Sequence, residues 1–387
     1  MTHTASLQDE LYAPPTTDLG EGWGQSLSNG ALGPTLLHLV TACAGLGPSE
    51  PAHAWLYTAT RAPVSSHADG GLFCGVTALA YVLHTTSPTH PAVTALDEHI
   101  NTLARDRLDT AHLRIERGEL PDTAEFDLIK GLTGIGAYLL AKEPQGSRTA
   151  GVLSYLVRLT QSVWHHDEEL PGWWAGNAPL SQGDFSGGHA NLGLAHGISG
   201  PLALLSLAYT SGVTVQGQRT AIERICSWMD HWRTIDTDGA RWPRWITRSQ
   251  LRDKDDAESN PMPLAWCYGI PGQARAQQLA AQALGDDNRR AMTIRALTSC
   301  ATNTDAITAL DGSLCHGRAG LLQTLRRAAD NDPTHALTPH LAELEHHTRG
   351  AACTGAGFLE GAAGNALALL PSTAHATSWD ACLLITG

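Results

Sequence analysis

A short turn with two glycines, followed by a strongly apolar segment, recurs seven times along this 387-residue chain. The first glycines of the seven copies are Gly30, Gly75, Gly131, Gly197, Gly269, Gly317 and Gly361. A second glycine stands three residues later in every copy except the second, which has Ala78 there. Successive copies are 44 to 72 residues apart, and the shortest intervals fit one pair of helices with its two loops. One such turn is weak evidence, but seven in a row predict a repeat architecture.

The segments after the turns differ from the segments between them. Those after the turns, such as 201–208 and 365–370, have almost no polar face, which is typical of helices buried on all sides. The segments 218–234 and 287–302 mix charged and apolar residues at helical spacing, as amphipathic helices do. No segment alternates long enough to favour a strand. The sequence therefore predicts an all-α fold, an α/α toroid of seven helical hairpins in which amphipathic outer helices surround buried inner ones.

We expect this toroid to form a single domain over residues 1–387, and the interrupted spacing at 84–125 leaves room for a small inserted extension. The glycine-rich turns stand at the N-termini of the inner helices, so they should gather at one end of the ring. Helix N-termini attract anions and negatively charged groups. A functional site is therefore expected at that end.

Charge and hydropathy exclude several classes of protein. There are 38 acidic and 25 basic residues, a formal net charge of −13, so nucleic acid is not an expected partner. No apolar run is long enough to span a membrane. The first 25 residues contain several acids and no apolar core of a secretory signal. We therefore expect a cytoplasmic protein, whose eight cysteines are reduced thiols rather than disulfides.

Two of the turns carry residues that bind metal ions. Cys267 and Cys315 each stand two residues before the first glycine of their turn, so the thiols take equivalent places in neighbouring repeats. His316 follows directly. Two cysteines and a histidine with an open fourth position are the pattern of a catalytic zinc site. A cysteine taken alone is more often a small buried apolar residue, so the prediction depends on the repeat equivalence, and Cys74 is the one further turn cysteine that could close the site.

Two other turns offer acid–base groups. Asp127 stands four residues before the first glycine of the third turn, and His196 stands directly before that of the fourth. A histidine and an aspartate at the same end of the ring can hold and transfer a proton. Asp127 could equally cap a helix, and His196 could be a buried core histidine. Trp173 and Trp174 could wall a peptide groove or pack in the core.

Three motifs together resemble the lanthionine synthetase C family, the lantibiotic cyclases. They are Asn-Leu-Gly-Leu-Ala-His-Gly at 191–197, Trp-Cys-Tyr-Gly at 266–269 and Cys-His-Gly at 315–317. All seven turns fit the family, so the resemblance covers nearly the whole chain. It implies a stand-alone cyclase of the class I lanthipeptide systems, because the chain lacks the long dehydratase region of the fused enzymes.

The resemblance also implies site residues and a reaction. The implied residues are three zinc ligands and three residues that line the active site: Cys267, Cys315 and His316, and Asp127, His196 and Tyr268. The implied reaction adds a substrate cysteine to dehydroalanine or dehydrobutyrine and forms a (methyl)lanthionine thioether ring. A free cysteine has a pKa of about 8.5, and coordination to Zn²⁺ deprotonates it. His196 is the expected proton donor to the enolate, with Asp127 assisting.

The implied partners are a dehydrated precursor peptide, with leader and core, a separate dehydratase and an exporter. A biosynthetic complex of these proteins would hold the cytoplasmic enzyme at the membrane periphery.

One position departs from the family pattern. Members commonly carry an arginine four residues before the first zinc cysteine, and this chain has Pro263 there. Arg248 or Arg252 could supply the missing charge. The departure keeps open an alternative function, a zinc- and thiol-binding relative without cyclase activity that serves as a peptide- or glutathione-binding scaffold. Protein prenyltransferases, which are also α/α barrels with zinc-activated thiols, are not favoured because their Asp-Cys-His ligand set is not found.

Overall fold

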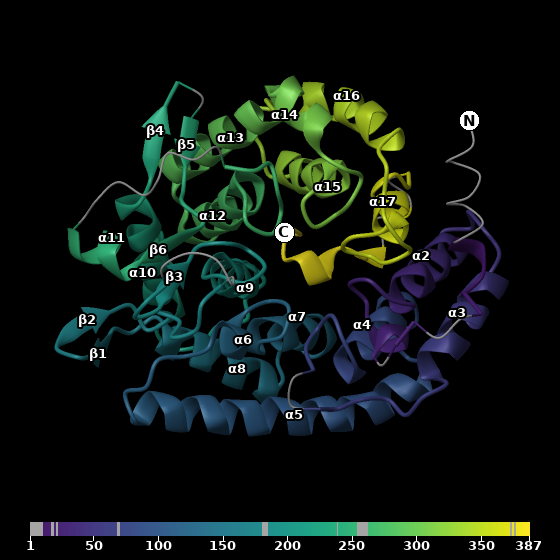
Figure 1. The fold of residues 1–387 in the computed structure, drawn as a ribbon, viewed down its shortest axis with the longest axis horizontal. Helices are drawn as coiled ribbons and strands as arrows, with labels where there is room; N and C mark the ends of the chain where they lie inside the picture. Colours follow the sequence, from purple (N-terminus) through teal and green to yellow (C-terminus); the bar gives the residue numbers. More distant parts are fainter. Residues whose placement is uncertain are drawn as a thin grey trace.

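An inner ring of helices forms the centre of the molecule. The computed structural model describes residues 11–16, 19–20, 22–67, 70–179, 185–237, 239–253, 262–371, 374 and 377–387. Within these ranges each glycine turn is followed by one helix: α2 (Leu32–Cys43), α4 (Val76–Thr86), α7 (Leu132–Lys142), α9 (Ser199–Thr210), α12 (Ile270–Leu284), α15 (Arg318–Ala329) and α17 (Ala362–Ala368). Consecutive helices of this set pack against each other, and α17 packs against α2, so the ring closes (Figure 1). The predicted all-α toroid is confirmed; its division into seven hairpins stays a prediction.

A second layer of helices surrounds this ring. Each outer helix packs against the inner helix that precedes it in the chain. The outer helices are α3 (Glu50–Thr60), α5 (Pro91–Glu116), α8 (Ser147–Leu159), α10 (Gln218–His231), α13 (Asp287–Thr302) and α16 (Thr338–Arg349). The interrupted segment 84–125 contains α5, which has 26 residues and also contacts α7 and α8. The proposed domain limits stay a prediction.

The two layers differ in burial as their sequences predict. In the inner helix α9, nine of twelve residues are buried, because neighbouring helices cover it on all sides. In the outer helix α10, six of fourteen residues are buried, and these recur at helical spacing along one face. The inner layer is therefore the hydrophobic core, and the outer layer separates it from water.

Short strands and helices occupy the connections between the main helices. The strands form three antiparallel pairs: β1 (Val163–His165) with β2 (Glu168–Leu170), β3 (His189–Asn191) with β6 (Trp245–Thr247), and β4 (Thr234–Asp236) with β5 (Gly239–Arg241). The short helices are η1 (Trp23–Gln25), α6 (Thr123–Phe126), α11 (Arg248–Asp253), α14 (Thr304–Ala309) and η3 (Ala381–Leu383). Each strand has three residues, too few for a recognisable alternation, and so the sequence did not indicate them.

Glycine is required in the turns because other backbone atoms come too close for a side chain. A Cβ on Gly197 would lie 2.5 Å from the carbonyl oxygen of Asn191, and a Cβ on Gly269 would lie 2.1 Å from that of Pro263. Both separations are far below van der Waals contact. The chain therefore folds back on itself just before the helix begins, and the glycines are needed for this close approach.

Backbone hydrogen bonds join neighbouring turns around the ring. The amide of Leu194 in the fourth turn donates to the carbonyl of Cys267 in the fifth at 2.9 Å. The amide of Cys267 donates in turn to Cys315 in the sixth at 3.2 Å, and that of Cys315 donates to Leu359 in the seventh at 2.8 Å. The bond from Leu128 to Ala195, 3.0 Å long, links the third turn to the fourth. These bonds hold equivalent residues of successive repeats in register.

The C-terminal segment 377–387 fills the interior of the inner ring, where the chain ends at the centre of Figure 1. The indole N–H of Trp266 donates to the carbonyl of Leu383 at 3.0 Å. The guanidinium of the fully buried Arg275 donates to the carbonyl of Ile385 at 2.8 Å. The tail thus bonds to the inner helices from within and replaces an axial cavity with packed core.

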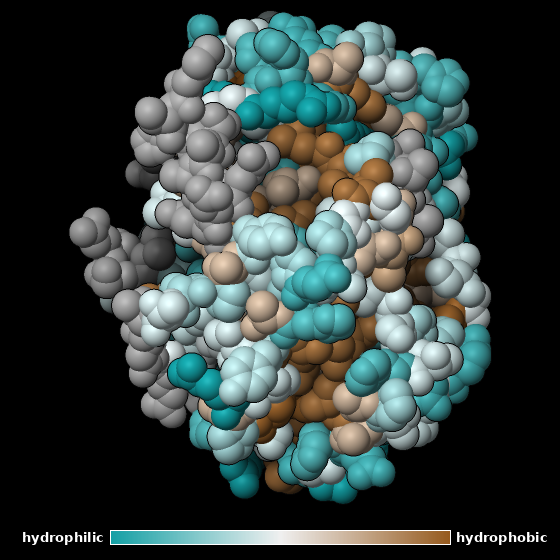
Figure 2. Space-filling model, turned by 90° about the vertical axis from the view of Figure 1, so that its right-hand side faces the viewer, coloured by the Kyte–Doolittle hydropathy of each residue, from teal (hydrophilic) through white to brown (hydrophobic). Residues whose placement is uncertain are grey.

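The outer surface is mixed in character. Figure 2 shows the side on which α2, α3 and α17 lie, where hydrophilic side chains border hollows with hydrophobic floors. Among the described residues, every helix is too short or too polar to cross a bilayer. Residues 1–10, part of the segment that the sequence argues is no secretory signal, lie outside the described ranges.

Candidate metal centre and active site

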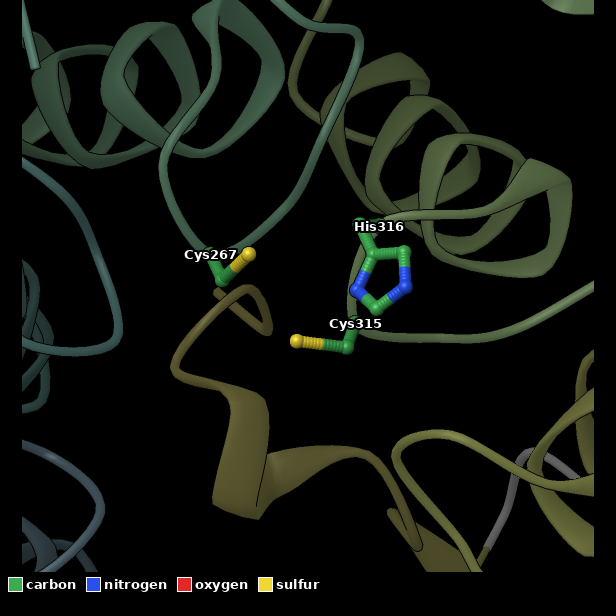
Figure 3. Close-up of side chains that lie close together, drawn as sticks. All are labelled: Cys267, Cys315 and His316. Atoms are coloured by element: carbon green, nitrogen blue, oxygen red, sulfur yellow. The ribbon is translucent and has the colours of Figure 1, made fainter. Parts of the chain in front are cut away.

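Cys267, Cys315 and His316 converge at the end of the ring where the turns lie. One ligand atom from each residue lies within 4.8 Å of the other two. Figure 3 shows the two sulfur atoms directed toward a common space, with the imidazole beside them. The backbone bond from Cys267 to Cys315 fixes the spacing between the two turns. The structure therefore brings together the three residues that the sequence predicted as metal ligands.

The electrostatics of these residues suit a metal ion. A hydrogen bond from the Cys315 thiol, together with His316, lowers the pKa of Cys267 to about 5. The pKa of Cys315 is raised because it shares its proton with the Cys267 sulfur and is itself buried. The hydrogen bond to Cys267 is also the main reason why the pKa of His316 is raised. The two sulfur atoms and the imidazole are thus joined by hydrogen bonds, and a metal cation bound between them would take the place of the shared protons.

The donor set fits zinc. Two sulfurs and one imidazole nitrogen are ligands that Zn²⁺ prefers, and three protein ligands leave a fourth position for substrate. Within the described part of the chain, no fourth His, Cys, Asp or Glu joins this group. Cys74 is exposed in the second turn and is not one of its members.

Asp127 and His196 form a hydrogen-bonded pair next to the metal ligands. Nδ1 of His196 lies 2.7 Å from Oδ2 of Asp127. The other oxygen, Oδ1, accepts from the backbone amides of Lys130 and Gly131 at 2.7 and 2.8 Å. The side chain of Asp127 is 2% exposed and that of His196 is 34% exposed. Asp127 therefore caps the third turn and holds His196 at the same time, and His196 is an accessible histidine rather than a core one.

Tyr268 connects this pair to the metal ligands. Its ring stacks on the imidazole of His196, with centroids 5.6 Å apart and an interplanar angle of 22°. Burial raises the pKa of Tyr268 to about 12, so the phenol stays protonated at neutral pH. Cys267 directly precedes Tyr268 in the chain. The stacking of His196 on Tyr268 therefore places His196 close to the group of Cys267, Cys315 and His316. The positive charge of His196 contributes to lowering the pKa of Cys267, after the larger effects of Cys315 and His316.

The residue directly before the first glycine is accessible in all seven turns, while that glycine itself is buried. These residues are Asn29, Cys74, Lys130, His196, Tyr268, His316 and Glu360. Lys130 and Glu360 were not among the predicted site residues, although their place directly before the turn glycine is a signal visible in the sequence. The charge of Glu360 contributes to raising the pKa of both Cys315 and His316. The accessible side chains around the site therefore include charges outside the group of Cys267, Cys315 and His316.

The arginines considered as replacements for the family arginine have other partners. Arg248 forms an ion pair with Glu168, and its guanidinium lies 5.8 Å from the ring centre of Trp174. Arg252 pairs with Glu168 as well, at 2.5 Å. Both are therefore engaged with strand β2. The electrostatic influence of His316 and, to a smaller extent, of His196 contributes to lowering the pKa of Cys267.

Of the two alternatives predicted for Trp173 and Trp174, a wall of a peptide groove or packing in the core, the structure shows packing in the core. Both side chains are at most 1% exposed. The indole of Trp174 donates to the carbonyl of Gly187 at 2.9 Å, and Trp173 packs edge-to-face on Trp228.

The fold and the site together define an α/α toroid with a zinc-type donor set and an adjacent His–Asp pair. The sequence model of the lanthionine synthetase C-like protein family matches residues 22–384. The chain is 24% identical over 333 residues to nisin biosynthesis protein NisC of Lactococcus lactis subsp. lactis, which covers 82% of this chain and 77% of NisC. The solved structure of nisin cyclase matches with a TM-score of 0.73 at 20% identity, over 95% of this chain and 93% of that one. The chain belongs to the lanthionine synthetase C-like family.

Proposed function

We propose that this protein is a zinc-dependent lanthipeptide cyclase, which closes thioether rings in a dehydrated precursor peptide. The observation that carries the proposal is the convergence of Cys267, Cys315 and His316 beside the Asp127–His196 pair. A three-ligand donor set with an adjacent acid–base pair is suited to activating a thiol and delivering a proton. The relationship to NisC, a nisin biosynthesis protein, supports the same reaction.

The proposed reaction is an addition that leaves the mass of the peptide unchanged. The S–H bond of a substrate cysteine breaks, a C–S bond forms at the β-carbon of a dehydroalanine or dehydrobutyrine, and the α-carbon takes up a proton. A zinc ion bound by the three ligands would supply one thing, a lower pKa for the substrate thiol. Thiolate ligands favour alkylation of the substrate sulfur because they leave it electron-rich.

The chain's own residues would handle the proton. Asp127 holds Nδ1 of His196, which leaves Nε2 as the nitrogen available to substrate. The imidazole is oriented from a second side by the ring of Tyr268. His196 is therefore the proposed donor to the α-carbon, and Asp127 and Tyr268 keep it in place. As partners we propose the precursor peptide, a separate dehydratase and an exporter.

A second candidate function is thiol binding without cyclisation, by a scaffold for peptides or glutathione. The observation in its favour is Pro263 at the position of the family arginine, together with the engagement of Arg248 and Arg252 by Glu168. In that case the metal ligands would bind a thiol, but no ring would form.

The deciding experiment follows ring closure in a synthetic peptide with one dehydroalanine and one cysteine. The zinc-loaded protein is incubated with the peptide, free thiols are then alkylated, and mass spectrometry measures the fraction that escapes alkylation. We expect the protected fraction to rise well above that in protein-free buffer, and to return to that level with Cys315→Ala. Glutathione binding without ring closure would support the scaffold function instead.

Metal content is measured on the same samples. Cys267→Ala, Cys315→Ala and His316→Ala should each lose most of the zinc. Cys74→Ala is the matched control, because Cys74 also lies in a turn but is not part of the metal-ligand group. It should keep wild-type zinc, and full zinc in Cys315→Ala would overturn the ligand assignment.

A further inference from the structure

A row of aromatic rings begins at His196 and continues through Tyr268. Tyr268 stacks on His196, and Trp245 of strand β6 meets Tyr268 edge-to-face with centroids 6.5 Å apart. Phe185 then meets Trp245 edge-to-face at 5.5 Å. These separations are typical of interacting aromatic pairs. The row is therefore continuous with the candidate active site and shares Tyr268 with it.

The three rings that follow His196 in this row are partly exposed. Tyr268, Trp245 and Phe185 are all half-buried, whereas the nearby Trp242 and Trp266 are each only 1% exposed. Trp245 therefore keeps part of its ring open to solvent beside Tyr268 of the candidate active site. An apolar ring face next to a catalytic centre gains free energy when it is covered by an apolar partner.

Trp245 is held in a fixed position relative to His196. In the antiparallel pair of β3 and β6, Trp245 lies opposite Asn191. The side chain of Asn191 accepts from the amide of Gly193 at 2.9 Å, and the amide of Leu192 donates to the carbonyl of Arg244 at 2.8 Å. The strand that carries Trp245 is thus bonded to the turn that carries His196. Such pre-organisation reduces the entropy lost when a ligand binds.

We propose that Trp245 and Phe185 bind the substrate peptide next to its reacting dehydro residue and favour apolar or aromatic side chains there. This inference depends on the proposed function, because it takes a dehydrated peptide as the occupant. The substrate peptide is the expected occupant because the aromatic row is continuous with the candidate active site. A peptide whose dehydro residue lies beside His196, and whose chain continues past Tyr268, would contact the uncharged rings of Trp245 and Phe185. Planar dehydroamino acids and apolar side chains both pack well on such faces.

The test separates peptide binding from ring closure. Binding is measured by fluorescence anisotropy with a labelled dehydroalanine peptide in which the cysteine is replaced by serine, so that no ring can form. Trp245→Ala and Phe185→Ala should each weaken this binding by roughly tenfold, and Trp245→Phe should restore most of it. Trp164→Ala is the matched control, because Trp164 is a tryptophan of strand β1 that is 69% exposed. Circular dichroism spectra and melting temperatures establish that each variant is folded.

Kinetics with the cyclisable peptide supply the second readout. A contact remote from the reacting bond is made equally in the ground and transition states, so KM should rise about tenfold while kcat changes little. Replacing the apolar residue next to the dehydroalanine by glutamate should weaken binding to the wild type, and this preference should vanish in Trp245→Ala. Wild-type binding and KM in both Trp245→Ala and Phe185→Ala would overturn the inference. Weaker peptide binding in these variants, with no ring closure by the wild type, would uphold the binding row and refute the cyclase function.

Discussion

Polar side chains in the interior of the ring and polar side chains at the end that carries the turns differ in their exposure to solvent. In the interior, the guanidinium of the fully buried Arg275 donates to Ile385, to Gln278 at 2.6 Å and to Asn331 at 2.8 Å. A buried cation without such partners would cost several kcal/mol. Each of these donors on Arg275 therefore has an acceptor within the chain, which keeps the buried cation satisfied.

At the turn end, strong ligands are left with accessible sides. The side chain of His316 is 51% exposed, and Cys315 is half-buried. His196 has one nitrogen bound by Asp127, and its ring is one-third exposed. Helices of the same inner ring thus serve two purposes. Their bodies are packed for stability, and their N-terminal turns keep polar side chains that solvent can reach.

The largest expected effect is on stability and lies in the interior. Trp379 of the C-terminal segment is fully buried and packs on Phe358 with centroids 5.9 Å apart. Trp379→Ala should lower the free energy of unfolding by about 3–5 kcal/mol, because it leaves a large cavity. Urea unfolding followed by circular dichroism measures the loss. Trp164→Ala, on an exposed strand, should stay within about 0.5 kcal/mol of wild type; equal losses in the two variants would mean that the tail does not stabilise the ring.

The second effect is a pH dependence of stability near the turn end. Burial of His189 lowers its pKa to about 4, whereas an unfolded histidine titrates near about 6.5. The folded state therefore resists protonation. The contribution of His189 to stability is complete above pH ~6.5 and is lost as the pH falls toward 4, by up to about 3 kcal/mol. The free energy of unfolding, measured by urea denaturation at several pH values, checks this. In His189→Gln this free energy should depend less steeply on pH between about 4 and about 6.5. An unchanged slope in that variant would assign the acid sensitivity to other groups.

A third effect concerns activity without stability. His196→Asn should slow ring closure by roughly 10²-fold, the usual size of an acid–base contribution, and keep wild-type zinc. Asp127→Asn should slow it similarly, because the bond to Nδ1 of His196 is weakened. The alkylation assay measures the rate, and metal analysis serves as the control. A wild-type rate in His196→Asn would make this histidine a structural residue.

The smallest effect is spectroscopic and concerns the metal-free protein. Because the pKa of Cys267 is lowered to about 5, one thiolate should be present at pH 7 and should be lost only as the pH falls through that value. Ultraviolet absorbance of the thiolate during an acid titration measures it. Cys267→Ala should abolish the signal. Cys226→Ala should leave it unchanged, because burial raises the pKa of Cys226 to about 12. An acid titration with the same amplitude in Cys267→Ala as in the wild type would contradict the shared proton.

The repeat architecture could be predicted from the sequence because its signals are local. Each glycine turn and each apolar segment can be recognised within a few residues, and the periodicity of helices is visible over two or three turns. The equivalent repeat positions of Cys267 and Cys315, with His316 directly after Cys315, also predicted their proximity, which the structure has. The sequence could not decide the role of Asp127, because a turn cap and a partner of a histidine were alternatives there. In the structure Asp127 makes both kinds of contact, one with the amide of Lys130 and one with His196.

Other features depend on contacts between residues far apart in the chain. The pairing of β3 with β6 joins segments more than fifty residues apart and sets Trp245 beside Tyr268. The ion pairs of Glu168 with Arg248 and Arg252 span about eighty residues. Strands of three residues and single ion pairs have no periodic signal, so the sequence could not indicate them.

The sequence by itself determined that this chain forms a closed ring of helices with two cysteines and a histidine on adjacent turns, since glycine spacing and side-chain chemistry are properties of the chain. The tertiary structure decided which groups are bonded and which stay open. It placed the C-terminal segment inside the ring, where it bonds Arg275, and it left Trp245 partly exposed beside the site. The physical reason is that burial and hydrogen-bond satisfaction are decided by packing among distant segments, which no short stretch of sequence contains.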